Sequence, residues 1–432
     1  MSQAILLANG RVIDPANQTD EIRDVLLLDG RIAGPAQAPA QSLRIDCTGL
    51  VVAPGFIDLH AHLREPGQTH KEDIGSGTRA AAAGGFTTVV AMPNTKPAVD
   101  SAAVFREVAE LIRQKAVVRV IQTAALSLGR QGTQLSDFAA LAAAGVKVVT
   151  DDGSTIQNPA LMLAAFELAK SCGLRIIDHC EDCDVCAGGA MHRGGVAERL
   201  GVPGQRRAVE DLIVARDIVL AAETGWPVHI QHISTAGAVA LVRDAQRRGL
   251  PVTAEASPHH LSLTDQAVLE HGANAKMNPP LREERDRLAV IEGLCDGTIQ
   301  SIATDHAPHS PEEKAAGLLK APAGILGFET ALPVCYTTLV RDGHLKLSQF
   351  VAAFTSGPRA ILGLDTGTLG LGEPADVTVF DPEAEIVVDA AASRSKSRNN
   401  PYHGQRLHGR VRATLVAGKA IFSNLPNLPG SI

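Results

Sequence analysis

The chain has 432 residues, of which 45% are hydrophobic and 20% charged, and its net charge is −7. This composition supports a large hydrophobic core, and it excludes a disordered protein and a broad basic surface for nucleic acid or anionic lipid. No apolar run reaches about 18 residues, and the start MSQAILLANGRV lacks a basic segment followed by a long apolar one. We therefore expect a cytoplasmic protein without nucleic-acid or membrane partners, which holds any anionic substrate by locally placed arginine or histidine.

Both ends of the chain predict short β-strands. In residues 1–52 the runs AILLANGRVI, DVLLLDGRIA and GLVVAPG alternate with turn signals such as Asn9-Gly10 and Asp29-Gly30. Residues 366–432 contain the similar runs ADVTVFDP, AEIVVDA and VRATLVAGKAIF, without a helical period. We predict one small composite β-sandwich domain made from residues 1–52 and 366–432.

The middle of the chain, residues 53–365, alternates strand and helix signals. The predicted strands are 55–62, 86–92, 117–124, 146–152, 174–179, 227–232, 251–256 and 299–306. Helical patterns lie between them, for example VFREVAELIRQK, ALMLAAFELAKSC and AVEDLIVARDIVLAAE. Eight apolar strands alternating with helices predict an α/β fold of the (β/α)8 TIM-barrel type. The competing fold, a doubly wound open sheet, is disfavoured because no G-x-G-x-x-G or phosphate-binding loop follows the first strand.

Polar side chains gather where these strands end. The residues concerned are His60 and His62 (first strand), Asp151 and Asp152 (fourth), His179 (fifth), His232 (sixth), and Asp305 and His306 (eighth). The carboxyl ends of barrel strands meet at one mouth, so these residues should converge although they are far apart in the sequence. A single histidine is more often a core or surface residue, but ligand-type residues at five of eight strand ends predict a metal site.

The spacing of His60 and His62 fits a metal site. Alternate residues of a strand point to the same side, so two imidazoles at positions i and i+2 can reach one ion. Imidazole together with carboxylate suits zinc, manganese or cobalt better than calcium. Because thiolate is absent from this set of residues, we expect an open catalytic site rather than a closed structural zinc site.

The sequence around these residues resembles the bacterial type I dihydroorotases of the amidohydrolase superfamily. The matching segments are PGFIDLHAHLREPGQTHKEDI, MPNTKP, TDDGS, DHCED, HIST, SPHH, KMNPPLR and ATDHAPH. They run in order from about residue 45 to 365, and HxHLREPG and ATDHAPH are the most specific of them. The resemblance implies the reversible cyclisation of N-carbamoyl-L-aspartate to L-dihydroorotate, a step of pyrimidine biosynthesis.

The resemblance also implies a set of metal ligands. One ion would be bound by His60, His62 and Asp305, a second by His179 and His232, and Asp152 would bridge the two. We expect one or two Zn2+ ions per subunit, with Mn2+ or Co2+ as substitutes. Many cyclic amidohydrolases bridge the ions with a carboxylated lysine, and Lys147 is the alternative bridge here, although we interpret it as an ordinary strand residue.

Asp305 is also the expected catalytic residue. A metal ion makes water far more acidic, so a nearby carboxylate can take the proton of the attacking water and later deliver it to the departing amide nitrogen. This role is compatible with that of a plain metal ligand. Asp151, as the neighbour of Asp152, points to the opposite side and is expected outside the ligand shell.

Substrate binding is expected from cationic and amide side chains at the same mouth. Arg64 can bind a carboxylate through two parallel hydrogen bonds; its alternative role is a surface ion pair with Glu65. The resemblance implies further substrate contacts, and the full set is His62, Arg64, Asn94, Asn278, His309, Ala323 and Gly324. Ala323 departs from the family, which usually has phenylalanine there, but a backbone contact does not need the ring.

Seven cysteines in a chain of this length argue against a disulfide framework and for a reducing compartment. Cys180, Cys183 and Cys186 form a C-x2-C-x2-C run that could hold a soft metal or an iron–sulfur cluster. Neither a fourth cysteine nor a proline follows as in ferredoxins, so we interpret the spacing as coincidence.

Two alternatives to a dihydroorotase stay open at this stage. The first is another cyclic amidohydrolase, such as a hydantoinase, dihydropyrimidinase or allantoinase; Arg64 and the aspartate bridge argue against it. The second is an inactive homologue that only scaffolds aspartate transcarbamoylase, which the complete set of ligand residues disfavours. A homo-oligomer is expected, and an active enzyme in complex with aspartate transcarbamoylase is also compatible with the sequence.

Overall fold

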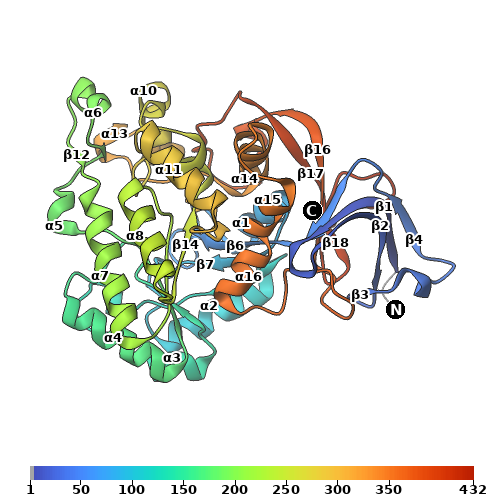
Figure 1. Cartoon of the computed structure of the whole chain (residues 1–432), viewed down its shortest axis with the longest axis horizontal. Coiled ribbons are helices and arrows are strands. Elements are labelled where there is room, and N and C mark those ends of the chain that lie inside the picture. Colours follow the sequence, from blue (N-terminus) through green and yellow to red (C-terminus); the bar gives the residue numbers. More distant parts are fainter. Residues whose placement is uncertain (1–3) are drawn as a thin grey trace.

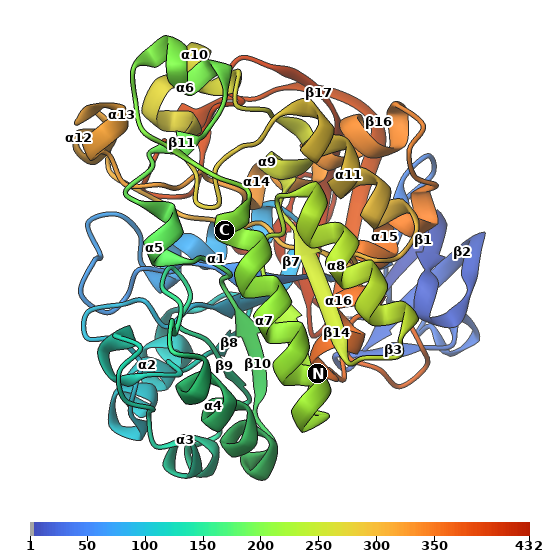
Figure 2. The ribbon, with the colours of Figure 1, turned by 60° about the vertical axis from the view of Figure 1, so that its left-hand side comes forward.

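The computed structural model describes residues 4–432, and eight parallel strands form the centre of its larger part (Figures 1 and 2). They are β6 (Phe56–Ala61), β7 (Phe86–Ala91), β8 (Arg119–Gln122), β9 (Val148–Val149), β10 (Arg175–Asp178), β13 (Val228–Ile230), β14 (Val252–Ala256) and β15 (Ser301–Ile302). Each overlaps one of the eight predicted strands. The α/β class of the fold is thereby confirmed.

These strands form two sheets whose edges are joined. One sheet has the order β6-β7-β8 and the other β15-β14-β13-β10-β9. Parallel bridges link Ala124 to Val149 at one junction and Ala61 to His306 at the other. At the second junction the His62 N–H donates to the His306 carbonyl at 2.9 Å. The carboxyl ends of β6 and β15 are therefore held side by side.

Helices follow most of these strands and surround them (Figure 2). The longer ones are α1 (Ile74–Ala83), α2 (Ala102–Lys115), α4 (Pro159–Cys172), α7 (Ala208–Thr224), α8 (Ala236–Arg247), α11 (Glu284–Cys295), α14 (Phe328–Cys335) and α15 (Leu347–Phe354). The shorter ones include α3 (Phe138–Ala144), α5 (Cys183–Cys186), α6 (Gly195–Leu200), α9 (Pro258–Ser262), α10 (Ala267–His271), α12 (Pro311–Lys314), α13 (Gly317–Lys320) and α16 (Ser356–Leu362). The three predicted helices are confirmed as α2, α4 and α7.

Local sequence explains where these helices begin and end. In α4 the Asn158 side chain accepts from the N–H groups of Ala160 and Leu161, and Pro159 occupies the first helical position. The helix ends at Gly173, whose φ of 68° is accessible to glycine at little cost. Asp73 and Ser76 form a capping box at the start of α1, directly after the loop that contains Arg64.

A second sheet combines strands from both ends of the chain. It contains β1 (Ile5–Asp14), β2 (Thr19–Leu28), β3 (Arg31–Ala33), β4 (Leu43–Asp46), β5 (Val51–Pro54), β16 (Val377–Val387), β17 (Arg406–Val416) and β18 (Lys419–Ser423). Its order is β18-β17-β16-β5-β1-β2-β3, and β4 pairs with β1. The blue and red ends of the chain therefore lie together on one side of the parallel strands (Figure 1).

An aromatic cluster joins the two parts. Phe56 of β6 stacks on Phe354 of α15 with ring centroids 5.0 Å apart, and Phe380 of β16 lies 6.1 Å from Phe56. Phe86 packs edge-on against Phe56, and all four rings are fully buried. Each such burial stabilises the fold by roughly 1.5–3 kcal/mol. The start of β6 is therefore anchored in the core, while its carboxyl end carries the histidines.

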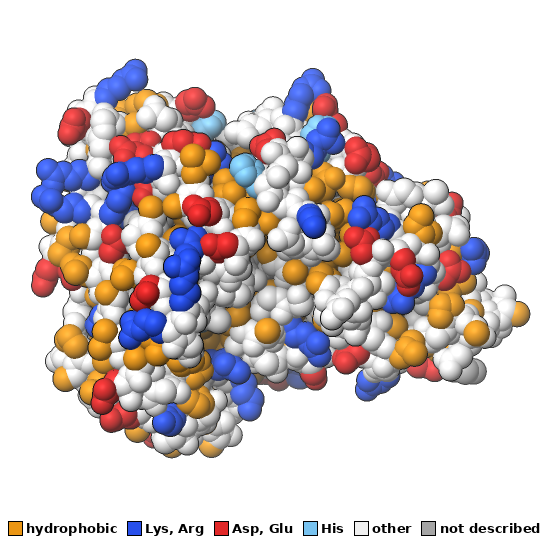
Figure 3. Space-filling model, viewed as in Figure 1, with side chains coloured by type: hydrophobic (Ala, Val, Ile, Leu, Met, Phe, Trp, Pro, Cys, Tyr) orange, Lys and Arg blue, Asp and Glu red, His pale blue; other side chains and the backbone are white. Residues whose placement is uncertain are grey.

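No helix in residues 4–432 is long and apolar enough to span a membrane. On the face shown in Figure 3, Lys and Arg side chains are interspersed with Asp and Glu side chains. This face therefore carries no broad basic patch.

Candidate metal and substrate site

The carboxyl ends of five parallel strands bring six buried ligand-type side chains together. His60 and His62 come from the end of β6, and Asp152, His179, His232 and Asp305 follow β9, β10, β13 and β15. All six are at most 6% exposed. The structure thus places every predicted metal ligand in one cluster.

Asp152 lies at the centre of this cluster. Its Oδ1 is 3.2 Å from His60 Nε2, 3.6 Å from His232 Nε2 and 3.7 Å from His179 Nδ1. Its Oδ2 is 3.6 Å from His62 Nε2. The carboxylate therefore faces all four imidazoles at once, which is the arrangement a bridging ligand requires.

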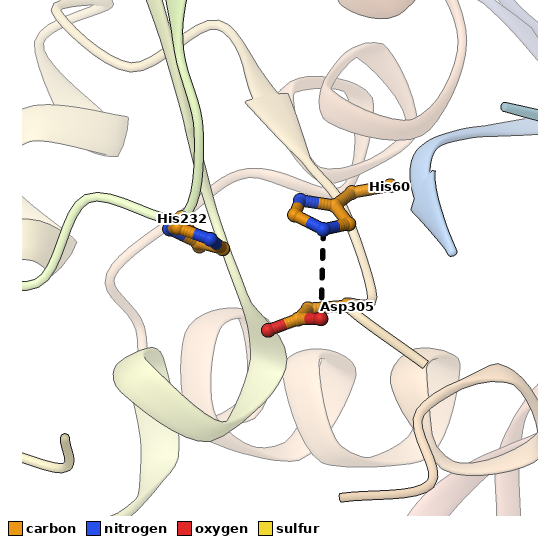
Figure 4. Close-up of side chains that lie close together, drawn as sticks. All are labelled: His60, His232 and Asp305. Atoms are coloured by element: carbon orange, nitrogen blue, oxygen red, sulfur yellow. Dashed lines mark ion pairs between the residues drawn. The ribbon is translucent and has the colours of Figure 1, made fainter. Parts of the chain in front are cut away.

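Asp305 faces the same histidines from the other side. Figure 4 shows its carboxylate below the His60 ring, with His232 beside them. Asp305 Oδ1 lies 3.6 Å from His60 Nε2 and 3.1 Å from His62 Nε2. Burial alone would raise the pKa of Asp305, but the charge of His60 and the hydrogen bond from His62 outweigh burial and lower it. Asp305 is therefore a deprotonated base near neutral pH.

The outer nitrogens of three histidines are held by acceptors. His60 Nδ1 lies 3.1 Å from Glu255, His62 Nδ1 2.9 Å from the Asn94 Oδ1, and His179 Nε2 3.0 Å from Glu181. These oxygens can accept the ring N–H at the outer nitrogen, so each ring would be able to present a lone pair at its other nitrogen to a bound metal ion.

The centre of the cluster fits a metal ion. His60 Nε2 and Asp152 Oδ1 are buried without a hydrogen-bond partner among the described residues. His179 Nδ1 and His232 Nε2 are 2.9 Å apart. The ligand atoms form three groups of metal-binding size: His60, His232 and Asp305; His60, His62 and Asp152; and Asp152, His179 and His232. Imidazole nitrogens and carboxylate oxygens that face one another in the interior can all bind to one shared cation, which would offset the cost of burying them.

A cavity of about 220 Å³ opens beside the cluster. Its walls include the predicted substrate residues His62, Arg64, Asn94, Asn278, His309 and Ala323, together with Asp152, Gly153, His179, His232, Met277, Asp305 and Ala307. Gly324 is oriented differently: its N–H donates to the Lys276 carbonyl at 2.8 Å, and its own carbonyl accepts from Asn399. Both backbone groups of Gly324 are thus engaged within the protein.

Arg64 is a buried cation in the wall of this cavity. Its Nε donates to the Pro308 carbonyl at 3.2 Å, and its Nη2 lies 3.2 Å from His309 Nε2. Burial lowers the pKa of Arg64 to about 10, which leaves the guanidinium charged at neutral pH. Among residues 4–432 no carboxylate oxygen lies within ion-pair distance of Arg64, and Glu65 pairs instead with Lys115. The alternative of a surface ion pair with Glu65 is therefore wrong.

Three residues of the site have unusual backbone angles. Arg64, His232 and Asp305 have φ values of 60°, 32° and 46°. Residues other than glycine rarely adopt this left-handed region of backbone angles. Those that do are concentrated at functional sites, where the surrounding structure holds the backbone in place.

Comparison with known proteins identifies the family. Residues 49–238 match the family model described as dihydro-orotase-like. The chain is 48% identical over 416 residues to a dihydroorotase of Solibacter usitatus, which covers 96% of this chain and 97% of that protein. It is 47% identical to a dihydroorotase of an Anaeromyxobacter species, with 98% of both chains covered. The chain belongs to the dihydroorotase family.

Solved structures with a similar fold include hydantoinases and dihydropyrimidinases. The L-hydantoinase (dihydropyrimidinase) of Arthrobacter aurescens superimposes with a TM-score of 0.88 at 25% identity, covering 99% of this chain and 97% of that one. The dihydropyrimidinase of Brevibacillus agri gives a TM-score of 0.85 at 24% identity, covering 98% and 95%. The sequence-based prediction of a dihydroorotase of the cyclic amidohydrolase class is thereby confirmed at the level of the family.

The residues weighed as alternatives lie outside the cluster. Lys147 is exposed just before β9. The Asp151 carboxylate is turned to Ser127, accepting its N–H at 3.0 Å and its hydroxyl. Cys180 is buried near Asp217, Cys183 is exposed, and within the described chain no metal-sized group joins them to Cys186. The interpretation of the cysteine spacing as coincidence agrees with this geometry.

Several supporting residues of this dihydroorotase family member are not predictable from strand ends. Glu255 and Glu181 hold the outer nitrogens of His60 and His179. Arg130 donates to the backbone carbonyls of Asp151 and Asp152 at 3.3 and 2.6 Å, and so holds the loop of the central carboxylate. Glu181 could have been found because it follows His179 by two residues; the other two have no such signal.

Proposed function

We propose that the chain is an active dihydroorotase that interconverts N-carbamoyl-L-aspartate and L-dihydroorotate. Its dihydroorotase relatives, 45–48% identical over nearly the whole chain, support this function. The observation that carries the choice of substrate is Arg64. Its buried guanidinium has no carboxylate within ion-pair distance among residues 4–432 and lies in the wall of a small cavity, so it calls for an anionic group on the ligand.

The ligand set would hold one or two zinc ions. His60, His62 and Asp305 are proposed for one ion, His179 and His232 for the second, and Asp152 for the bridge. Mn2+ or Co2+ suits the same imidazole and carboxylate ligands. When bound, such an ion lowers the pKa of water and polarises a carbonyl oxygen, which supplies the nucleophile and stabilises developing negative charge.

Asp305 is proposed to move the proton. In hydrolysis, water adds to the ring amide carbonyl, and the carboxylate of Asp305 takes a proton from that water. As the C–N bond breaks, Asp305 gives this proton to the departing ring nitrogen, which becomes the ureido NH2. The second proton of the water is released to solvent when the new carboxylic acid ionises to the carboxylate. Ring closure is the reverse: it removes one carboxylate charge and consumes one proton, so lower pH favours the ring.

The substrate is proposed to lie in the cavity, with its reacting amide next to Asp305 and its carboxylate on the side of Arg64. Arg64, Asn94 and His309 would bind its carboxylate, and Asn278 and the backbone at Ala323 its amide groups. His62 contacts both Asn94 and Asp305, so it connects the carboxylate side of the cavity to the reacting side. Gly324 is proposed to shape this loop beside the substrate, because its own N–H and carbonyl are both hydrogen-bonded within the protein.

The remaining expectations extend this proposal. We propose that the eight parallel strands form a closed (β/α)8 barrel in residues 53–365, and that residues 1–52 and 366–432 form the composite β-sandwich. The bridges at both sheet junctions and the shared sheet support this division. The type I subgroup, the homo-oligomer, the cytoplasmic location and a complex with aspartate transcarbamoylase stay predictions.

An assay on three substrates tests the proposal against its nearest rival. Purified protein loaded with zinc is incubated with dihydroorotate, hydantoin and allantoin, and ring opening is followed for each. We expect hydrolysis of dihydroorotate alone, since only this ring carries the carboxylate that Arg64 would bind. Preferential hydrolysis of hydantoin would favour a hydantoinase, and no activity on any ring would favour a scaffold protein.

A further inference from the structure

Residues 393–400 of the C-terminal region, here called the strap, lie against the loops that form the substrate cavity. Ser395 donates its hydroxyl to Glu72, and Ser397 donates its hydroxyl to the Lys71 carbonyl at 2.8 Å. Lys396 Nζ lies 2.5 Å from an Asp73 carboxylate oxygen. The strap is therefore fastened to the loop that follows Arg64, although it is more than 300 residues away in the sequence.

Asn399, next to the last residue of this strap, is buried. Its side-chain Nδ2 donates to the carbonyls of Ala307 and Gly324, both at 2.9 Å. Its Oδ1 accepts the His309 N–H at 3.1 Å, and the side chain is 2% exposed. Its backbone carbonyl also accepts the Leu326 N–H at 3.0 Å. One amide thus uses both donors and its acceptor to join two loops of the cavity wall.

These two loops lead directly to Arg64. The Pro308 carbonyl and the His309 ring both lie within hydrogen-bond distance of the Arg64 guanidinium, each at 3.2 Å. Gly324 approaches the His309 ring so closely that a Cβ there would lie 2.6 Å from His309 Cδ2. The position of the arginine therefore depends on the 307–309 turn, and the position of that turn depends on Asn399.

We propose that Asn399 is a positioning residue that sets the affinity of the cavity for the substrate carboxylate. The inference rests on the proposed function, since it assumes that Arg64 and His309 bind this carboxylate. Asn399 is separated from the ligand cluster by the turn that carries His309. Its loss should therefore weaken binding in the ground state and the transition state alike, raising KM with little change in kcat.

Asn399→Asp is the sharpest variant. It keeps an acceptor for His309 but turns a carboxylate oxygen toward two carbonyls in place of the amide donors. Asn400→Asp is the matched control, because Asn400 is the adjacent buried amide and its Oδ1 accepts the Tyr402 N–H, which an aspartate can still do. Asn399→Ala removes all three side-chain hydrogen bonds without adding charge.

The experiment compares the zinc-loaded wild type with the three variants, with His309→Ala, and with the double variant of His309→Ala and Asn399→Ala. For each protein kcat and KM for dihydroorotate, the metal content and the melting temperature are measured. We expect Asn399→Asp and Asn399→Ala to raise KM about tenfold or more, with kcat within about threefold and unchanged metal content. Asn400→Asp should match the wild type. On the His309→Ala background, Asn399→Ala should add much less than tenfold, because both act on the same loop.

An unchanged KM in both Asn399 variants would overturn the proposal. So would a KM in the double variant that is raised by the product of the factors measured for Asn399→Ala and His309→Ala alone. Failure of both variants to fold, or a loss of bound metal, would show a structural role and also overturn it. If the wild type itself does not open dihydroorotate, the proposed function fails instead. The two failures are therefore distinguishable.

Discussion

His60 Nε2 lies 3.2 Å from Asp152 Oδ1, and both atoms are buried without a hydrogen-bond partner among residues 4–432. The outer nitrogen of the same ring is fixed by Glu255. An imidazole nitrogen and a carboxylate oxygen thus face each other in the protein interior. This arrangement fits a shared metal ion, and it connects the end of β6 to the loop after β9.

Asp152→Ala should lower the metal content. Asp152 faces all four histidines, so its removal takes one ligand from each proposed ion, and we expect affinity for zinc to fall at least about tenfold. Elemental analysis after dialysis measures the effect. Lys147→Ala is the control and should keep wild-type metal content; the opposite pattern would move the bridge to Lys147.

Asp305→Asn should abolish turnover in both directions while the protein still folds. The amide cannot accept the proton of the attacking water, and general acid–base catalysis typically contributes about 10²–10⁴-fold to the rate. Rates are measured from dihydroorotate and from N-carbamoyl-L-aspartate, with circular dichroism as the test of folding. Asp20→Asn, at a partly exposed carboxylate of the terminal sheet, should behave as the wild type. A near-normal rate in Asp305→Asn would remove its proposed acid–base role.

Arg64→Lys should raise KM for dihydroorotate by about a hundredfold. Lysine keeps the charge but loses the planar fork that can form two parallel hydrogen bonds with a carboxylate. Steady-state kinetics measures the change, and the exposed Arg79→Lys is the matched control. If KM stayed within about twofold of the wild type, the carboxylate would have to be bound elsewhere.

Glu181→Gln should weaken metal binding without removing a ligand. Glu181 accepts from His179 Nε2 at 3.0 Å and from Asn278 Nδ2 at 2.8 Å, and these contacts contribute to lowering its pKa to about 2 although burial opposes ionisation. Carboxylates of this kind typically contribute about 10–100-fold to metal affinity. Competition with a chelator gives the affinity. The exposed Glu167→Gln should show no change, and an equal affinity in both variants would contradict the role.

His192 should make stability depend on pH. Burial, with Arg282 and Arg207 nearby, lowers the pKa of His192 from 6.5 to about 4. Between these values the unfolded chain binds the proton and the folded chain does not, so the free energy of unfolding should fall as pH decreases from 6.5 to 4. Urea titrations at pH 6.5 and 5 measure the fall, which should be smaller in His192→Gln. An identical fall in both proteins would contradict this assignment.

The strands and the ligand cluster were predictable because they follow simple periodicities. Apolar runs that alternate with helices specify parallel strands, and the convergence of their carboxyl ends brings His60, His179 and His232 together. The lengths of β9 and β15 were overestimated, since the predicted 146–152 and 299–306 contain ladders of only two residues. After Ile302 the chain no longer pairs as a strand, and Asp305 points into the site from a backbone with a positive φ.

The supporting contacts were not predictable from the sequence. Asn399 bonds to His309 across 90 residues and to Gly324 across 75, and it lies in a region that the strand pattern assigns to the composite domain. Such contacts depend on how loops from distant elements pack against each other, and the local periodicity of the sequence does not predict this packing. Glu255 is similar, because its place in a strand says nothing about which histidine it reaches.

The most direct test of the central claim measures dihydroorotate hydrolysis and metal content on the same sample. The protein is stripped with a chelator and then titrated with zinc, and the rate of ring opening is recorded at each step. We predict that stripped protein is inactive and that the rate rises with bound zinc to a plateau at one or two ions per chain. Ring opening at full rate without metal, or none at full zinc loading, would contradict the account.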